Sequence, residues 1–130
     1  MNYIPKYFLY NSNIKEFTIP DNVTSIGYNA FRSCSSLTSV VIGDGVKTIG
    51  DAAFFDCESL KHVIIGNNVT SMGESLFWNC KSLISIKYLG TKREALTKLK
   101  VRNKLWREDS AISKIICIDG IIELWKWMMH

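Results

Sequence analysis

The sequence predicts a mostly β solenoid, in which short parallel strands recur on stacked turns of 23 residues and a helix with a β-hairpin closes the last turn. The first observation is that three residue types recur at this spacing. They are Phe31, Phe54 and Phe77, then Cys34, Cys57 and Cys80, and then Leu37, Leu60 and Leu83. A fixed period with apolar positions in register indicates identical units that stack into one continuous core.

The second observation is the apolar pattern within each period. The segment L-x-x-V-x-I, as in Leu37–Ile42, puts alternate apolar residues on one face of a short strand. Strands stacked about 4.8 Å apart form a parallel sheet and join their buried faces. A Gly-Asp-Gly turn, a second extended piece such as VKTIG, and a helical or 3₁₀ turn over A-F-x-x-C-x-x-L are expected to complete each turn. The phenylalanines and cysteines are expected to form buried ladders, the cysteines as free thiols.

The same step of 23 residues places Phe8 in the ladder ahead of Phe31, so the first turn is expected to follow the period without a gap. Little chain precedes it beyond Tyr3, Ile4 and Pro5. Because a terminal turn presents an unpaired strand edge, three interpretations stay open. The short lead caps the edge, or two chains dimerise there, or further repeats precede it.

The chain is expected to be one continuous domain, with the solenoid of about four turns in residues 1–90 and the cap in residues 91–130. Apolar residues suited to covering the last turn are Ala95, Leu96, Leu99, Leu105 and Trp106. Asp119-Gly120 predicts a type I′ hairpin turn. The final segment holds Trp125, Trp127, Met128 and Met129. It either packs on the cap or forms a partner-binding or oligomer-forming tail.

The repeat unit I-P-x-x-V-T-x-I-G-x-x-A-F-x-x-C-x-x-L-x-x-V-x-I, which residues 19–42 follow almost position for position, resembles the BspA-like class of leucine-rich repeat. The resemblance covers residues 4–88 and implies an α/β leucine-rich-repeat solenoid. YLGTKREAL at 88–96, Trp106 and IICIDGII at 115–122 are similar to the ending common in that family, although Leu96 stands near where the family often has tryptophan. The resemblance implies non-enzymatic surface, adhesion or interaction proteins of host-associated bacteria, their phages and some anaerobic protists. It implies no particular ligand.

The residues give no pattern for catalysis, a metal or a cofactor. No nucleophile, zinc-protease, phosphate-loop or dinucleotide motif is present in the sequence. The cysteines have no C-x₂-C pairs, and neither His62 nor His130 has a cysteine or carboxylate at ligand spacing. We therefore expect a protein that is not an enzyme and that uses no cofactor.

Positive charge is concentrated after the repeats. Residues 1–91 hold seven basic and seven acidic side chains, whereas residues 92–130 hold nine and five, so the later segment carries the net charge of +4. The basic run is either a solvated helix face or a polyanion-binding patch. No apolar run is long enough to span a membrane, and no signal peptide is visible. The location stays open between cytoplasm, phage particle and fragment of a surface protein.

Candidate binding residues are those that alternate with the buried positions. Two rows are expected to face outward from the strands: Glu16, Ser39, His62 and Ser85, and then Thr18, Val41, Ile64 and Lys87. A third row follows the ladder phenylalanines: Leu9, Arg32, Phe55 and Trp78. Phe55 and Trp78 are expected either to stack on each other or on nearby lysine side chains, or to form an aromatic platform for a sugar or protein.

These rows, with Trp125 and Trp127, favour a non-enzymatic interaction or adhesion module that recognises a protein or glycan. The alternative is a polyanion or nucleic-acid binder that uses residues 92–107, although the match of the repeats disfavours a nucleic acid. We expect a monomer or a weak homodimer.

Overall fold

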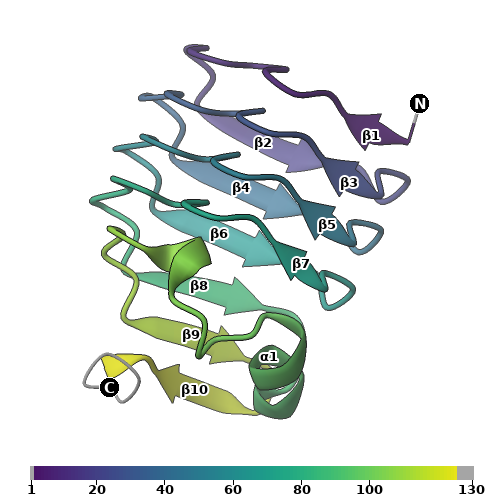
Figure 1. Ribbon diagram of the computed structural model, residues 1–130, viewed down its shortest axis with the longest axis vertical. Helices are drawn as coiled ribbons and strands as arrows, with labels where there is room; N and C mark the ends of the chain where they lie inside the picture. Colours follow the sequence, from purple (N-terminus) through teal and green to yellow (C-terminus); the bar gives the residue numbers. More distant parts are fainter. Residues whose placement is uncertain (1, 126–130) are drawn as a thin grey trace.

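The computed structural model describes residues 2–125 and shows a stack of turns closed at one end by a helix and a hairpin (Figure 1). The larger sheet has the order β10-β9-β8-β6-β4-β2. Its strands are β2 (Glu16–Ile19), β4 (Ser39–Ile42), β6 (His62–Ile65), β8 (Ser85–Tyr88), β9 (Lys114–Cys117) and β10 (Gly120–Glu123). The smaller sheet contains β1 (Tyr3–Ile4), β3 (Ser25–Ile26), β5 (Thr48–Ile49) and β7 (Ser71–Met72). The predicted solenoid with its C-terminal cap is confirmed.

The phenylalanine ladder (Phe31, Phe54 and Phe77) runs through the centre of the core, and all three rings are fully buried. The rings of Phe31 and Phe54 are stacked, with centroids 5.2 Å apart, and those of Phe54 and Phe77 lie 5.7 Å apart. Equal rings at equal spacing fill the same volume on every turn, which gives the close packing that a stable core requires.

Backbone hydrogen bonds also join the stretch that carries the phenylalanine ladder from turn to turn. The Phe31 N–H donates to the Ala53 carbonyl at 2.7 Å, and the Phe54 N–H donates to the Leu76 carbonyl at 3.1 Å. Bonds between residues three apart run within each stretch, such as Cys34 N–H to the Phe31 carbonyl. Non-glycine residues take positive φ at a spacing of four: Asn29 and Ser33, Ala52 and Asp56, and Ser75 and Asn79. The stretch is therefore a series of consecutive β-turns, and the helical or 3₁₀ turn predicted there is wrong.

The first turn departs from the 23-residue period. Tyr3 pairs with Ser25, a step of 22 residues, whereas Glu16 pairs with Ser39, a step of 23. The Leu9 N–H donates to the Ala30 carbonyl, which is also a step one residue shorter than that from Phe31 to Ala53. The chain is thus one residue short before β2, so Leu9 takes the ladder position and packs on the core.

The prediction for Phe8 is corrected by this shift. Its side chain is 44% exposed and covers the end of the core, with its ring 6.2 Å from Phe17 and 6.4 Å from Phe31. Leu9, predicted to lie in an outward row, is half-buried. A missing residue in a loop shifts every position before it by one, and the repeat of residue types hid the gap.

The cap continues the core at the other end. Helix α1 (Lys92–Lys98) begins with a capping box, in which the Thr91 hydroxyl accepts from the Glu94 N–H and the Glu94 carboxylate accepts from the Thr91 N–H. A 3₁₀ helix, Leu105–Arg107, brings Trp106 against the last ladder ring, Phe77, and leaves it 1% exposed. The indole therefore buries the apolar face that the last repeat leaves open.

The hairpin joins the larger sheet, because β9 pairs in parallel with β8 and β10 pairs antiparallel with β9. Cys117 pairs with Gly120, so the two turn residues are Ile118 and Asp119. Neither has the positive φ that a type I′ turn requires, and the turn predicted at Asp119-Gly120 is wrong. The Asp119 carboxylate instead accepts from the Lys92 N–H at 2.8 Å, which ties the hairpin to the start of α1.

Replacing Phe54 with alanine tests the dependence on the ladder. Phe54 stacks on a ring in both directions, so Phe54→Ala should lower the free energy of unfolding by about 3–5 kcal/mol, as loss of a buried aromatic side chain does. Urea unfolding followed by circular dichroism measures the loss. Phe55→Ala, at the half-buried neighbouring position, should cost less than half as much. A melting temperature for Phe54→Ala close to that of the unmodified protein would contradict the central role of the ladder.

Replacing Ala52 with glycine tests the left-handed turn positions. Ala52 has φ 56°, where a β-carbon is unfavourable by roughly 1–2 kcal/mol. Ala52→Gly should therefore raise the free energy of unfolding by up to about 1 kcal/mol, since the gain exceeds the added entropy of the unfolded chain. The matched control is Ala53→Gly, one residue on, where Ala53 is buried and has no positive φ. We expect the control to be destabilised, and a loss of stability in both variants would refute strain at Ala52.

Candidate functional site

The outer face of the larger sheet carries a continuous row of side chains. Strand pairing aligns Val41 with Ile64, Ile64 with Lys87, and Lys87 with Ile116 across β4, β6, β8 and β9. Ile116 is aligned in turn with Ile121 on β10. Since alternate residues of these strands are buried in the core, this row lies on the opposite, solvent-facing side.

The sequence predicts that Val41, Ile64 and Lys87 lie in one row, but it does not predict the extension of that row into the hairpin. Ile116 is 39% exposed and Ile121 is 50% exposed. The alternation in Lys114–Cys117, with buried Ile115 and Cys117, was the available signal. The sequence assigns the hairpin to the cap but gives no register that would join it to β8.

A shallow hollow of about 250 Å³ lies within this outer face. Its lining comes from β6, β8 and β9 and from the residue before β6: Lys61, His62, Val63, Ile64, Ser85, Lys87 and Ile116. The lining therefore combines the aliphatic residues Ile64 and Ile116 with the basic residues Lys61 and Lys87. Apolar surface bordered by positive charge suits a partner that offers both aliphatic and acidic groups.

The third predicted row forms a stack along the turns. The Arg32 guanidinium carbon lies 4.2 Å from the centre of the Phe55 ring, and the Phe55 and Trp78 rings are parallel with centroids 5.8 Å apart. Because Arg32 and Trp78 belong to the turns before and after Phe55, both faces of the Phe55 ring are covered. A sugar cannot stack on that ring, so the row stabilises neighbouring turns more than it offers an open platform.

The tail predicted to bind a partner is only partly described. Trp125 lies two residues after the end of β10, beyond the buried Leu124, and is 57% exposed. Trp127 lies outside the described residues, as do Met128 and Met129.

Two positively charged residues of the basic segment 92–107 are held in contacts within the protein. Lys98 forms an ion pair with Glu94 at 3.1 Å and donates to the Asn67 carbonyl at 2.9 Å. Arg107 is 7% exposed and donates through Nη2 to the Val101 carbonyl at 3.2 Å, and burial lowers the pKa of its guanidinium. These two cations hold the cap together, which leaves fewer positive charges for a polyanion.

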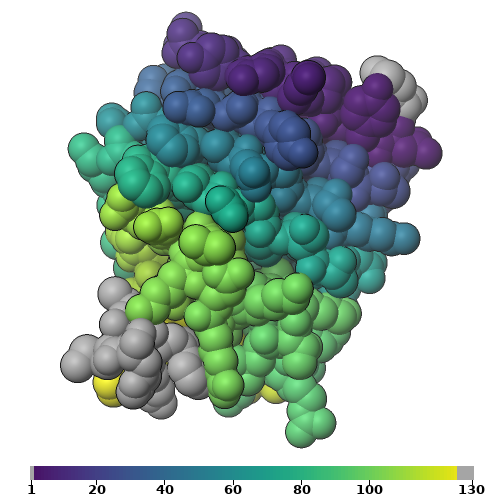
Figure 2. Space-filling view, viewed as in Figure 1, coloured from purple at the N-terminus to yellow at the C-terminus, as the bar shows by residue number. Residues whose placement is uncertain are grey.

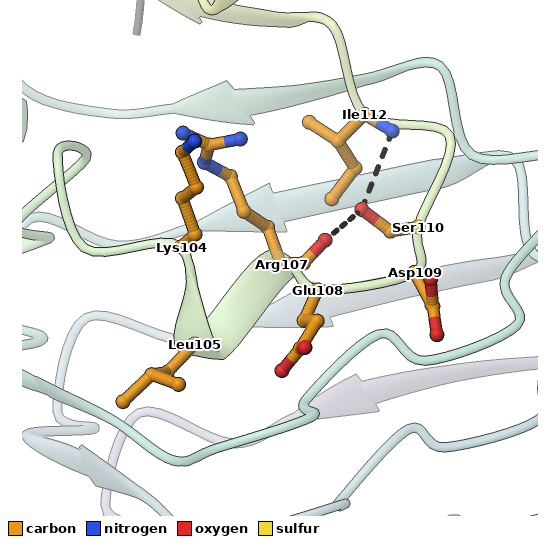
Figure 3. A pocket seen from close by; sticks show the side chains of 7 residues that line it. All are labelled: Lys104, Leu105, Arg107, Glu108, Asp109, Ser110 and Ile112. Atoms are coloured by element: carbon orange, nitrogen blue, oxygen red, sulfur yellow. Dashed lines mark hydrogen bonds between the residues drawn. The ribbon is translucent and has the colours of Figure 1, made fainter. Parts of the chain in front are cut away.

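A hollow of about 400 Å³ lies beside the 3₁₀ helix of the cap (Figure 3). In the figure, Lys104 and Arg107 extend to one side of this helix and Glu108 to the other. The Ser110 hydroxyl donates to the Arg107 carbonyl and accepts from the Ile112 N–H, which fixes the chain after the helix. The residues that line the hollow carry both positive and negative charges. The hydrogen bonds of Ser110 join residues of the cap to one another, so the hollow is a structural feature of the cap.

The ladder cysteines are buried free thiols. Each donates to a carbonyl on the preceding turn, Cys34 to Leu9 at 3.0 Å, and then Cys57 to Phe31 and Cys80 to Phe54 at 3.1 Å each. Burial raises the pKa of Cys80 to about 12 and raises that of Cys57 further. Such thiols stay protonated at neutral pH and act as small buried donors. Within residues 2–125, no group of three or more His, Cys, Asp and Glu side chains is placed to hold a metal ion.

The comparison with known families decides what kind of repeat this is. The family described as BspA type leucine-rich repeat region matches residues 2–104, in six copies. The chain belongs to this family. Its 23-residue turns, cysteine ladder and parallel strands are therefore those of a BspA type repeat protein, as the sequence predicted. No curated protein matches the chain.

Three solved leucine-rich-repeat proteins resemble this BspA type chain. One from T. pallidum has 22% identity and a TM-score of 0.57, and the match covers 65% of this chain and 51% of that one. One from Eubacterium ventriosum has 35% identity and a TM-score of 0.56, with 60% of this chain and 21% of that one covered. One from Bacteroides ovatus has 28% identity and a TM-score of 0.51, with coverage of 63% and 27%. The chain thus spans about half of the first protein and about a quarter of the others.

The family and these neighbours support a repeat module of the interaction or adhesion type. Leucine-rich-repeat proteins of this kind are generally non-enzymatic. Their solenoids present an extended surface through which they bind partners. Among the helices of the described residues, none is long and apolar enough to cross a membrane.

The raised pKa of the buried thiols predicts a loss of stability at alkaline pH. When the pKa of a thiol is higher in the folded than in the unfolded protein, the thiol contributes its full stabilisation at a pH below its pKa in the unfolded chain. That stabilisation is lost as the pH rises toward the pKa of the thiol in the folded protein. For Cys80, the fall between about pH 8 and about pH 10 should amount to about 1–2 kcal/mol. Cys80→Ser keeps a donor for the Phe54 carbonyl but does not ionise. From about pH 8 to about pH 10, the unfolding free energy of Cys80→Ser should therefore fall by about 1–2 kcal/mol less than that of the unmodified protein. An equal fall in the two proteins would contradict the burial of Cys80 as the cause.

Proposed function

We propose that the protein is a non-enzymatic module that binds a protein partner through the outer face of its larger sheet. The observation that carries the proposal is the aliphatic row Val41, Ile64, Ile116 and Ile121, which with Lys87 in its middle crosses five strands. Isoleucine side chains left 39% and 50% exposed on a regular sheet form a flat apolar surface of the kind that protein interfaces cover.

The charges around this row indicate the chemistry of the partner. Lys61, Lys87 and Lys114 are exposed on or beside the same face, and Lys114 is aligned with Ser85. We expect the partner to present aliphatic side chains at the centre of the contact and carboxylates at its rim. Rim charges of this kind speed association and set specificity more than they add affinity.

A protein partner is favoured over a glycan by the packing of Phe55 in the third row. Glycan sites depend on open ring faces, and both faces of Phe55 are covered by Arg32 and Trp78. The residues that the outer face offers are instead aliphatic and mostly basic, with the carboxylates of Glu16 and Glu123 on its first and last strands. The polyanion alternative is weakened by the use of Lys98 and Arg107 within the cap.

Charge substitutions on the outer face test the proposal. Ile116→Asp and Ile121→Asp should each weaken capture of the partner by roughly 30-fold, about 2 kcal/mol, because a carboxylate is forced into a desolvated apolar contact. The matched control is Leu105→Asp, which changes a side chain of similar exposure, 46%, on the 3₁₀ helix of the cap. Binding of labelled variants to host-cell surface extracts measures the difference, with circular dichroism as the check on folding.

The polyanion and glycan alternatives predict different results in the same experiment. Capture that survives Ile116→Asp but falls steeply with salt, with retention on heparin that is lost when Lys92 and Arg93 are replaced by glutamate, would overturn the proposal in favour of a polyanion. Binding to a glycan array that depends on Trp78 would overturn it in favour of a sugar.

A further inference from the structure

A small hollow of about 100 Å³ lies where the cap meets the last turn of the repeats. Figures 1 and 2 show this boundary, at which the green cap lies directly beside the teal turn that carries β7. Thr70, Ser71 and Met72 of that turn form one wall. The cap supplies the other lining residues: Lys98, Leu99, Lys100, Asn103 and Trp106. This volume suits a few water molecules or one small polyatomic ion, and it is too small for a peptide or a sugar.

The buried part of the lining contains a hydrogen-bond donor without an acceptor. Trp106 is 1% exposed, and its indole N–H has no hydrogen-bond partner among the described residues. A donor that is removed from water and left without an acceptor is destabilising, so most buried donors in folded proteins are paired. We therefore expect a group in the hollow that accepts a hydrogen bond from the indole.

Further donors stand at the rim of the hollow. The Lys100 ammonium and the Ser71 hydroxyl form no hydrogen bond or ion pair with any described residue. The side-chain oxygen of Asn103 accepts from a backbone N–H of the cap at 3.0 Å, which leaves its amide nitrogen to donate. The charge of Lys98 is balanced by Glu94 at 3.1 Å, but no acidic side chain lines the hollow itself. These donors favour an anion.

Two backbone carbonyls of the repeat wall are unpaired acceptors. The Lys47 carbonyl accepts from the Thr70 N–H at 2.9 Å, and the Ile49 carbonyl accepts from the Gly73 N–H at 2.8 Å. One step of 23 residues later, the equivalent carbonyls are those of Thr70 and Met72, which face the cap, and both residues line the hollow. No residue that the structure describes donates to them. The group that suits the hollow therefore donates as well as accepts.

We propose that this hollow binds one hydrogen phosphate group. Its oxygens accept from the Trp106 indole N–H and the Lys100 ammonium, and its O–H donates to the backbone carbonyls beside β7. Inorganic phosphate retains at least one proton at neutral pH, so it offers both kinds of group. Sulfate has a similar shape but no proton at that pH, and it would leave the carbonyls unpaired.

The site is separate from the proposed protein contact. It lies at the end of the smaller sheet, beside β7, whereas the row from Val41 to Ile121 crosses the larger sheet. A phosphate held there bonds to the last repeat turn and to the cap at once, so it stabilises the junction between them. Phosphate binding therefore does not depend on the partner-binding function, and each is tested without the other.

The indole N–H of Trp106 is a direct reporter of the site. Inorganic phosphate, titrated into the unmodified protein at constant pH and ionic strength, should shift the Trp106 indole resonance in heteronuclear NMR spectra until the shift saturates. Sulfate is the matched control and should bind roughly tenfold more weakly, because it cannot donate to the carbonyls of Thr70 and Met72. Trp106→Phe serves only to identify the resonance.

A pair of lysine substitutions tests the placement of the site. Lys100→Met removes the unpaired ammonium from the rim and should raise the dissociation constant for phosphate roughly tenfold, because a charge-assisted bond is lost. The control is Lys92→Met, which removes the same charge from an exposed position at the start of α1, outside the hollow. It should change the constant by less than about twofold, since salt screens the more distant charge.

A third ligand distinguishes the source of the phosphate group. Binding of glycerol phosphate as tightly as inorganic phosphate assigns the site to a phosphomonoester, and weaker binding assigns it to free phosphate. Titration of the unmodified protein without a saturable shift overturns the proposal and leaves the hollow to water. Equal binding of phosphate and sulfate also overturns it, and so does an equal loss in Lys100→Met and Lys92→Met, because both results indicate general attraction to the positive charge of the cap.

Discussion

The return of the backbone to the same place after each turn is the constraint on which the rest of the structure depends. Backbone bonds between turns form in both sheets and along the turns that carry the phenylalanine ladder. They require each residue to lie over its equivalent, so the side chains above and below a position are also equivalent. Stacked rings such as Phe31 and Phe54, 5.2 Å apart, follow from that register and fill the core.

The register also explains which residues are chosen at strained positions. Each turn needs two left-handed residues four apart, and Asn29, Asp56 and Asn79 suit this because asparagine and aspartate tolerate positive φ. Glycine is required after the strands of the smaller sheet for a different reason. A β-carbon at Gly50 would lie 2.8 Å from the Tyr28 nitrogen on the turn before, so the close approach of successive turns excludes any larger residue.

A stack of equal turns has two ends at which the core is exposed, and this chain covers the two ends in different ways. At the C-terminal end Trp106 packs on Phe77 and the hairpin extends the larger sheet. At the N-terminal end Phe8 covers part of the core and the strand edges remain unpaired. The outer face gains from the first solution, because β9 and β10 add Ile116 and Ile121 to the row begun by Val41 and Ile64. The cap is therefore also part of the candidate binding surface.

The sequence by itself determined the solenoid, the period of its repeats, the burial of the ladder residues and the family. These follow from local pattern, because residues that recur at one spacing must meet equivalent neighbours. Only the tertiary structure decided the exchange of Phe8 for Leu9, the hairpin turn at Ile118-Asp119 and the pairing of β9 with β8, whereas stacking of Phe55 on Trp78 was one of the two arrangements that the sequence predicted. Each depends on a register between segments far apart in the chain, and a one-residue gap or a pairing of β8 with β9 leaves no mark in the local pattern of residues.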